Sequence, residues 1–562
     1  MIGDDSGRLL WRKQGKRLQL RRFLLDLAAL ALILLAPFAT VLSFNGYSYF
    51  TPEVMLIVAC ALTAAALLAL LLGFVGGLVR SAVLAALLVL FIDVQVGRPP
   101  WSSLTLAVVT LASIAMLAAV LWVLREHATA ILCVIFVTLL GLTLARGNPG
   151  SHQIVREQAP AAGSADSEAP LLIHLLLDEH IGVEGLPPEI PPARELRAEL
   201  TEFYTSRGFR LFGGAYSQYA NTYNSIANLL NFATDQVGHP YVLHGSDEAV
   251  WDLKEAAYFR TLQQRGYRLH VYQSSYMDLC HADGIQLQDC TTYPVSSLGL
   301  LQDLQLPAWE KTRAIGNAIV TNSAVLHVLS KVYERGIRAA LLQVGWQAPA
   351  WRWQPPSFGP LRVPAVFERL SEDVLRHPRG HAFFAHLILP HYPYVFDSRC
   401  TLRSRTSDWL TNRISSTDPL VYNTADSRAQ KYERYVEQAR CVLRMLDGLL
   451  TQLERRGLLD NATVVVHGDH GSRIPRHYPR RMTLAAGVLD EADYRDTFST
   501  LYAIRSPGVS PGYDADPVPV VQLLNHHLGR EPLRRQSSCR VFLLQDDGQG
   551  TLVAVEPKFC AP

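Results

Sequence analysis

Charged residues are nearly absent from one long part of this chain. Aspartate, glutamate, lysine and arginine make up 18% of its 562 residues, yet they almost vanish between Leu27 and Leu144. Five apolar stretches fill that region, at residues 23–44, 54–75, 78–96, 104–124 and 128–144. Each is near the roughly 20 residues that a helix needs to cross a hydrocarbon core. A succession of five excludes a cleavable signal peptide, so residues 23–146 are predicted to be a transmembrane region of five helices rather than buried helices of a soluble protein.

Basic residues predict the orientation of this region. Residues 1–22 form a tail rich in lysine and arginine, which the positive-inside rule keeps in the cytoplasm. Counting spans alternately, Arg80 and Arg125 fall in cytoplasmic turns, whereas the outer loops contain only Arg98. Five crossings leave everything after Arg146 outside. We therefore expect a multi-pass protein of the bacterial cytoplasmic (inner) membrane with a periplasmic or extracellular domain.

Cysteine is also scarce, and no CxxC or zinc-finger spacing occurs among the 8 cysteines. Cys60 and Cys133 lie inside the apolar stretches, and the other six lie in the polar part. An even number of cysteines outside the membrane indicates disulfides, the alternative being six buried free thiols. Six cysteines allow fifteen pairings, and proximity in the sequence favours Cys280–Cys290, Cys400–Cys441 and Cys539–Cys560.

The polar part of the chain has the pattern of an α/β domain. Residues 147–170 are rich in glycine, alanine, serine, proline and glutamate and are predicted to be a flexible linker. From Leu171 to the C-terminus, short apolar runs at residues 171–177, 209–212, 267–272, 382–389, 463–466 and 500–504 alternate with helical stretches at residues 192–207, 225–232, 251–265, 314–335 and 429–456. This alternation indicates a mainly parallel sheet covered on both faces.

The net charge and one tryptophan-rich run bear on possible partners. The formal net charge of +2 and the absence of any recognisable nucleic-acid module give no reason to expect a nucleic-acid partner. A run with three tryptophans, Trp346, Trp351 and Trp353, is either a loop facing lipid or substrate or, as we favour, a segment packed on the domain surface.

Chemistry-bearing residues follow the ends of several predicted strands, where open α/β sheets bind their ligands. The first strand ends at Asp178-Glu179, and residues 463–466 lead into His467-Gly468-Asp469-His470-Gly471. Carboxylate and imidazole suit zinc or manganese, although a solvated strand end and a polar turn are the simpler interpretations. Thr222 lies at a helix entry, either as an N-cap or near helix amides that suit a phosphoryl group.

A further candidate, His391, lies between prolines in Leu389-Pro390-His391-Tyr392-Pro393. A histidine held in this way can move a proton at a leaving group or bind an oxyanion, or it is a structural loop residue. All four candidate groups therefore lie just beyond a predicted strand or at a helix entry.

The order of these motifs resembles the alkaline phosphatase–sulfatase superfamily, in particular its membrane-anchored phosphoethanolamine transferases and lipoteichoic-acid synthases. The resemblance implies an extracytoplasmic sulfatase-like catalytic domain over residues 171–562, with a divalent metal, Zn or Mn, on Glu179 (Asp178 as neighbour or alternate), Thr222, Asp469 and His470. It makes Thr222 the nucleophile and His391 the oxyanion histidine, with His477 as a possible second-site ligand. Sulfatases of this superfamily need cysteine or serine where Thr222 stands, so an ordinary sulfatase is disfavoured.

The expected function is therefore a metal-dependent phosphotransferase of the cell envelope. It would move a phosphoethanolamine or glycerophosphate headgroup from a membrane lipid donor to an envelope glycan or glycolipid through a phospho-threonine. The alternatives are a membrane-anchored phosphodiesterase or phosphatase that uses water, and a non-catalytic envelope-assembly protein.

Overall fold

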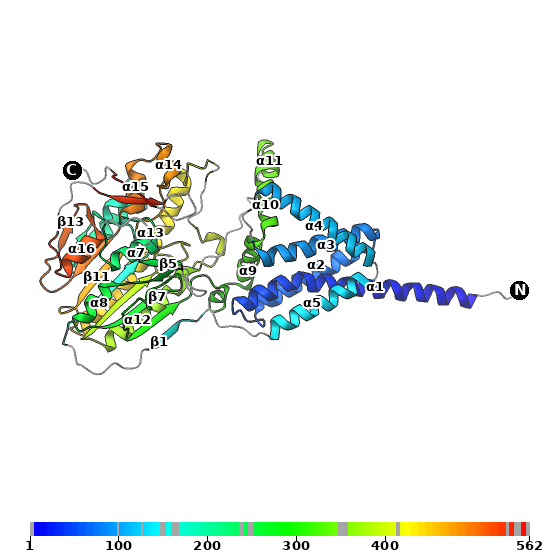
Figure 1. Ribbon diagram of the computed structural model, residues 1–562, viewed down its shortest axis with the longest axis horizontal. Helices are drawn as coiled ribbons and strands as arrows, with labels where there is room; N and C mark the ends of the chain where they lie inside the picture. The colour runs from blue at the N-terminus through cyan, green and yellow to red at the C-terminus, as the bar shows by residue number, and fades with distance from the viewer. Residues whose placement is uncertain are drawn as a thin grey trace. The chain divides into compact units, whose positions relative to one another are not determined.

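The chain forms two compact units. The computed structural model describes residues 5–97, 101–124, 127–145, 153–158, 168–234, 241–244, 251–346, 358–411, 416, 418–534, 539–544 and 552–557. One unit comprises residues up to 152 together with residues 297–356, and the other comprises residues 153–296 and 357–562. Each unit is described by itself below (Figure 1).

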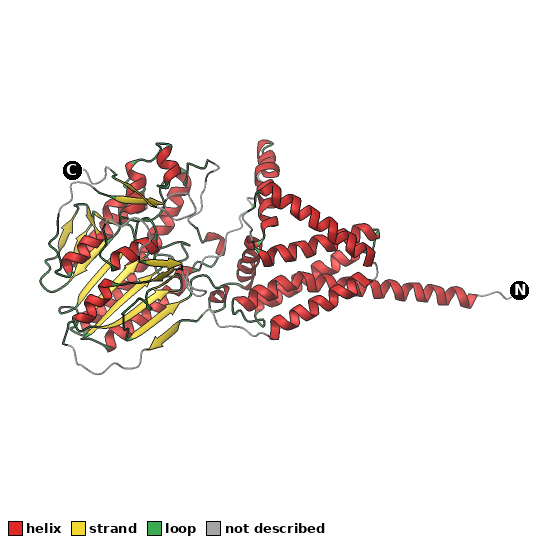
Figure 2. Cartoon of the chain, in the orientation of Figure 1, coloured by secondary structure: helices red, strands yellow, loops and turns green. Residues whose placement is uncertain are grey.

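The first unit contains the five predicted apolar helices. They are α1 (Asp5–Phe44), α2 (Pro52–Leu72), α3 (Gly77–Val96), α4 (Ser103–Leu124) and α5 (His127–Ala145). Each contains a stretch long and apolar enough to cross a membrane, which in α1 begins only at Leu20. In the described residues the regular structure of this unit is entirely helical (Figure 2). The five-helix prediction is confirmed, except that helix α1 extends back into the predicted basic tail.

Two charged residues of the apolar helices are buried as a pair. Arg80, predicted to lie in a turn, instead lies in the first turn of α3, where its guanidinium contacts the Asp26 carboxylate of α1. The same nitrogen is 3.4 Å from the Thr129 hydroxyl of α5. Both charged side chains are more than nine-tenths buried. Because an unpaired charge is costly in a membrane, this contact holds three helices together.

Residues 297–356 belong to the helical unit, whereas we predicted an uninterrupted domain over residues 171–562. This segment contains α9 (Ala308–Asn322), α10 (Ala324–Val332), the π-helix η3 (Tyr333–Arg338) and α11 (Ala339–Gln343). Polar contacts connect it to the loop after α1: the Ser297 hydroxyl donates to the Asn45 carbonyl, and the Leu298 amide donates to the Asn45 side chain. Such long-range hydrogen bonds leave no periodic signal in the sequence.

The second unit is built on a nine-stranded sheet in the order β1-β9-β7-β10-β2-β11-β12-β3-β13. Its central strands β7 (Arg268–Ser274), β10 (His381–Leu387), β2 (Leu172–Leu177) and β11 (Thr463–Gly468) are parallel. The outer strands are β1 (Val155–Gln158), β9 (Asp289–Tyr293), β12 (Tyr502–Arg505), β3 (Arg210–Phe212) and β13 (Gly512–Asp514), of which β1 and β12 run antiparallel to their neighbours. The mainly parallel α/β prediction is confirmed.

Helices cover both faces of this sheet. On one face α7 (Thr222–Leu230), α8 (Ala257–Gln264) and α16 (Val520–His527) share a hydrophobic core with Leu172, Leu176, Phe384 and Val465. Strand alternation points Ile173 and Leu175, which are also buried, to the other face. There α6 (Pro191–Ser206), α12 (Val363–Arg376) and α13 (Ala425–Arg455) pack together, and α12 contacts β10.

Smaller elements complete the unit. They are β4 (Ala215–Tyr216), β5 (Val242–His244), β6 (Trp251–Leu253), β8 (Met277–Asp278), β14 (Val518–Pro519), β15 (Val541–Leu544), β16 (Leu552–Val555), α14 (Arg481–Ala485), α15 (Glu491–Phe498) and short 3-10 turns. The predicted helix over residues 251–265 therefore begins as a strand. Part of the predicted linker also differs, because residues 155–158 form edge strand β1, where Arg156 pairs with Asp289 at 2.6 Å.

Two predicted disulfides are present, Cys280–Cys290 and Cys400–Cys441. Cys560, the predicted partner of Cys539, lies outside the described residues. Cys60 and Cys133 are free thiols, as expected for residues inside the apolar helices.

Candidate metal and phosphoryl-transfer site

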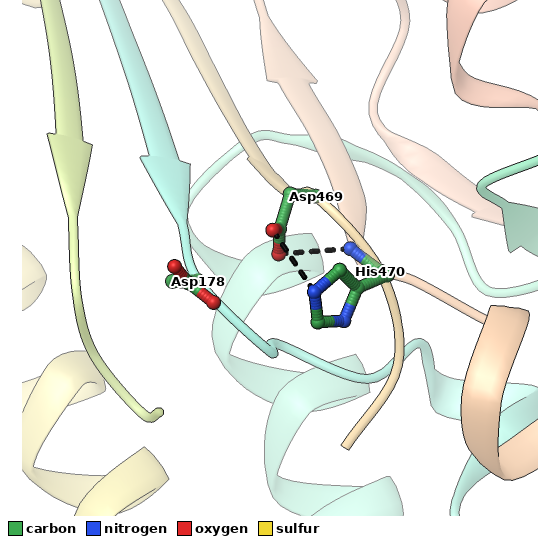
Figure 3. Close-up of side chains that lie close together, drawn as sticks. All are labelled: Asp178, Asp469 and His470. Carbon is green, nitrogen blue, oxygen red and sulfur yellow. Dashed lines mark hydrogen bonds and ion pairs between the residues drawn. The ribbon is translucent and has the colours of Figure 1, made fainter. Parts of the chain in front are cut away.

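The register of three central strands brings the predicted acidic residues together. Leu177, the last residue of β2, is aligned with Gly468 of β11 on one side and Leu387 of β10 on the other. Asp178 and Asp469 therefore leave neighbouring strands at the same level of the sheet. One ligand atom each of Asp178, Asp469 and His470 lies within 4.8 Å of the others (Figure 3), and all three residues are buried.

The hydrogen bonds of this group leave one oxygen of each carboxylate without a partner. Asp469 Oδ1 accepts from the backbone amides of Glu179 and His470, both at 2.9 Å, whereas Asp469 Oδ2 and Asp178 Oδ1 are buried without a hydrogen-bond partner. His470 Nδ1 lies 3.0 Å from the Gly471 carbonyl, which places the proton on Nδ1. Nε2 then presents its lone pair 3.2 Å from Asp469 Oδ2. Two acceptors facing each other in this way fit a bound divalent cation.

Electrostatics of the buried carboxylates give the same indication. Burial and the neighbouring Asp178 carboxylate raise the pKa of Asp469 to about 7. Burial also raises the pKa of Glu179 well above its usual range, although Arg473 opposes the shift. For Asp178, the nearby His391 and His386 outweigh burial and lower the pKa. A cation would relieve the repulsion among these carboxylates.

Thr222 opens α7 at this group. Its Oγ1 lies 3.4 Å from His470 Nε2. The N-cap of α7 is Asn221, whose side chain accepts from the Asn224 amide, so the Thr222 hydroxyl is not used as a cap. The Ser225 hydroxyl, one turn on, donates to the Asp469 carbonyl at 2.6 Å and fixes the helix entry to the strand end.

Glu179 is not part of the three-residue group, although it was our first choice of ligand. Its backbone has a left-handed φ of 60°, and its Oε1 lies 3.6 Å from His391 Nε2 and 3.6 Å from Arg473 Nε. Asp178, the predicted alternate, lies in the three-residue group because it is the first residue beyond the strand. Glu179 instead connects the predicted oxyanion histidine with an arginine.

Arg473 is a residue that the sequence interpretation missed. Its Nη2 lies 2.8 Å from His470 Nε2 and 2.7 Å from the Ala220 carbonyl, which also accepts from Nε at 3.0 Å. Its φ is 53°, a strained conformation for a residue other than glycine. The signal in the sequence is its position three residues after His470, inside a Gly-Ser loop.

A second missed residue is His386, near the end of β10. Its Nε2 lies 3.2 Å from Asp178 Oδ2, and its ring is fully buried. It therefore orients the Asp178 carboxylate from the neighbouring strand, as an outer-shell partner of a ligand does.

His477, the predicted second-site ligand, lies elsewhere. Its backbone amide donates to Asp493 Oδ1 at 2.9 Å, and its Nδ1 lies 3.0 Å from Asp493 Oδ2. The structure does not bring it together with Asp178, Asp469 and His470.

The glycines of the Asp-His motif serve close packing. A Cβ on Gly468 would lie 2.4 Å from the His180 carbonyl oxygen, and one on Gly471 would lie 2.2 Å from the Asp496 carbonyl oxygen. Their φ angles are not left-handed, so the requirement is space for neighbouring backbone.

The chain thus combines five apolar helices long enough to cross a membrane with an α/β unit that carries a candidate metal site of two carboxylates and one imidazole. Residues 363–495 match the sulfatase family model. Lipoteichoic acid synthase of Staphylococcus aureus (strain USA300) is 25% identical over 152 residues, which are 26% of this chain and 21% of that protein. The chain is therefore similar to the sulfatase family over residues 363–495 and to lipoteichoic acid synthase over about a fifth of that protein's length, which confirms the predicted resemblance.

Solved structures that are similar to part of the chain include the following two. The C-terminal periplasmic domain of EptC from Escherichia coli is 11% identical and has a TM-score of 0.35, covering 69% of this chain and 92% of that one. Phosphonate monoester hydrolase from Silicibacter pomeroyi is 16% identical and has a TM-score of 0.35, covering 67% and 80% of the two chains.

Proposed function

We propose that this protein is a metal-dependent phosphotransferase of the bacterial cell envelope. It moves a phosphoethanolamine or glycerophosphate headgroup from a lipid donor to an envelope glycan or glycolipid through a phospho-threonine at Thr222. The observation that carries the proposal is the Thr222 hydroxyl. It is buried, is not used as a helix cap, and lies 3.4 Å from Nε2 of a histidine in a candidate cation site.

Asp178, Asp469 and His470 would hold the cation, Zn or Mn. When bound, it acts as a Lewis acid that lowers the pKa of a nearby hydroxyl and neutralises phosphoryl charge. His386 and the amides of Glu179 and His470 orient the two carboxylates. These contacts fix the ligands before any substrate arrives, which reduces reorganisation during the reaction.

Two bonds change in the first step. The Thr222 Oγ1–phosphorus bond forms as the hydroxyl proton passes to water, and the bond from phosphorus to the diacylglycerol oxygen breaks, so diacylglycerol leaves. Arg473 is placed to bind a phosphoryl oxygen, because its guanidinium lies at the Thr222 and His470 end of the site. His391 is placed to protonate the leaving oxygen, and Glu179, 3.6 Å away, supports the protonated ring.

The second step reverses these roles. A hydroxyl of the acceptor attacks phosphorus, His391 takes its proton, and the Thr222 oxygen leaves and regains its proton from water. Anchoring by five helices supports a lipid donor, because it keeps the site at the membrane where the donor is. With water as acceptor the same residues would give a hydrolase.

The test uses full-length protein in nanodiscs with Mn²⁺ or Zn²⁺. Phosphatidylethanolamine or phosphatidylglycerol, each labelled in the headgroup phosphate, is supplied with an envelope glycolipid extract. Label in the glycolipid together with released diacylglycerol supports transfer, and an acid quench should trap label on the peptide that contains Thr222. Free headgroup phosphate with or without acceptor would assign a hydrolase. No diacylglycerol from either lipid would contradict both and leave the envelope-assembly protein.

A further inference from the structure

Residues 297–356 belong to the helical unit, although they interrupt the sequence of the second unit. The last part of this segment carries exposed apolar side chains. Helices α10, η3 and α11 run from Ala324 to Gln343 with no break, and α10 contacts α3 and α4 (Figure 1). None of the chemistry proposed above uses this segment. Its sequence, residues 324–346, carries three basic residues against one acidic residue.

The start of α10 is fixed at one end of a membrane-spanning helix. Asp93 accepts from the backbone amides of Ala324 and Val325, both at 3.2 Å, and contacts the Ser323 hydroxyl. Asp93 lies in the last turn of α3, which ends at Val96. A helix of 20 residues rises about 30 Å, the thickness of the hydrocarbon core. Helix α10 therefore begins at the boundary between hydrocarbon and headgroups.

Among the side chains of this segment that the structure describes, five large apolar ones are exposed. The exposed fractions are 49% for Leu329, 56% for Val332, 55% for Ile337, 78% for Val344 and 71% for Trp346. Val332 follows Leu329 by three residues, as on one face of an α-helix. Ile337 follows Val332 by five residues, which matches the wider turn of the π-helix at Tyr333–Arg338. The π turn thus keeps the apolar stripe on one face.

We propose that residues 324–346 lie in the membrane surface and that this apolar stripe is buried among lipid acyl chains. The stripe faces lipid because α10 begins at the depth of Asp93 and packs against α3 and α4, which cross the hydrocarbon. An excess of basic residues and an exposed tryptophan are typical of interfacial helices. The proposal rests on the helices crossing a membrane and is independent of the reaction. Trp351 and Trp353 lie outside the described residues.

The test is fluorescence quenching of full-length protein in nanodiscs. Single cysteines replace Val332, Ile337 or Val344, each in a Cys60→Ser, Cys133→Ser background, and carry an environment-sensitive label. Gln343→Cys is the matched control, because Gln343 is an exposed polar residue beside Val344. Quenchers are a nitroxide lipid with a shallow acyl label and a water-soluble nitroxide.

The three stripe positions should be quenched several-fold more by the nitroxide lipid than by the soluble quencher, and Gln343 should show the reverse order. Equal access of all four labels to the soluble quencher would overturn the proposal. So would protection of the stripe from both quenchers, since that would place protein over it. Diacylglycerol release by the labelled variants is measured in parallel. A lack of release would count against the proposed reaction alone, whereas the quenching result alone decides the lipid contact.

Discussion

The backbone amide of Glu179 donates to Oδ1 of Asp469 at 2.9 Å, joining two residues that are 290 positions apart. The bond saturates one carboxylate oxygen of Asp469 and leaves Oδ2 toward His470. It also ties the Glu179 backbone, which has a left-handed φ, to the residue that follows β11. The predictions below follow from this arrangement and from the rest of the fold.

The nucleophile is tested by two substitutions of one residue. Thr222→Val keeps the shape and removes the hydroxyl, so headgroup release should fall about a thousandfold or more. Thr222→Ser should retain measurable activity. The melting temperature of both variants should stay close to that of the parent, because Asn221 caps the helix and a lost cap would cost only about 1 kcal/mol. Unchanged turnover in Thr222→Val would end the phospho-threonine mechanism.

The choice between Asp178 and Glu179 as ligand is decided by metal content. Asp178→Asn and Asp469→Asn should each weaken metal binding by more than about a hundredfold, since removing an outer-shell partner alone costs 10–100-fold. Glu179→Gln should keep the metal, measured by elemental analysis after dialysis. Asp493→Asn, which removes a carboxylate that pairs with His477, is the control and should also keep it. Loss of metal in Glu179→Gln alone would reverse the assignment.

The two disulfides should differ in their effect on stability. Cys400–Cys441 closes a loop with a sequence separation of 41, and Cys280–Cys290 one of 10. The loop-entropy relation gives about 4 kcal/mol for the longer loop and about 3 kcal/mol for the shorter one. Double Cys→Ser variants of each pair, compared by calorimetry, should therefore rank in that order. An equal melting temperature for all three proteins would contradict it.

Stability should decrease as the pH falls from 7 toward 4, in part because of His381. Burial and the neighbouring His270 and His377 rings lower the pKa of His381 from its ordinary 6.5 to about 4. Between pH 6.5 and about 4 the unfolded chain binds a proton that the folded protein does not. The contribution of neutral His381 to the free energy of unfolding is therefore complete above pH 6.5 and is lost as the pH falls toward 4. His381→Asn should flatten the fall in melting temperature between pH 7 and 5.

His281 offers the opposite control for that pH profile. The Asp278 carboxylate raises its pKa, so its contribution is present at low pH and decreases as the pH rises. His281→Asn should steepen the fall in melting temperature toward low pH. Identical profiles for both variants and the parent would show that neither histidine controls the acid limit.

Orientation in the membrane is tested by reporter fusions. A reporter joined after Arg146 should be active only outside the cytoplasm, because the basic tail and the arginine-poor outer loops orient the first helix. A reporter at the N-terminus should be active only inside. Activity of the first fusion in the cytoplasm alone would invert the proposed topology.

Much of this arrangement is predictable from the sequence because it depends on local patterns. The five apolar stretches are recognisable by their length and composition, and the central strands by short continuous apolar runs. Strand ends in parallel sheets meet at one edge, which places Asp178, Asp469 and His470 together. Thr222 could be placed at a helix entry, but its cap could not be assigned, since Asn221 and Thr222 are both common at helix starts.

Other features depend on contacts between distant residues. Arg473 and His386 reach the site through loop geometry and strand order, which no short motif encodes. The same holds for edge strand β1, which pairs with β9 more than a hundred residues later. The Asp93 cap of α10 and the Asn45 contacts assign residues 297–356 to the helical unit, although they interrupt the sequence of the catalytic unit.

The two ends of that interruption are adjacent, which has a practical consequence for making the catalytic unit in soluble form. The Phe358 amide donates to the Val295 carbonyl at 3.2 Å, so a few glycines can replace residues 297–356 without stretching the fold. A truncated protein that begins at Leu171 and keeps those residues would expose Leu329, Val332 and Trp346 to water and would lose the Arg156–Asp289 ion pair of β1. Starting at Gln153 and excising residues 297–356 should yield the soluble enzyme instead.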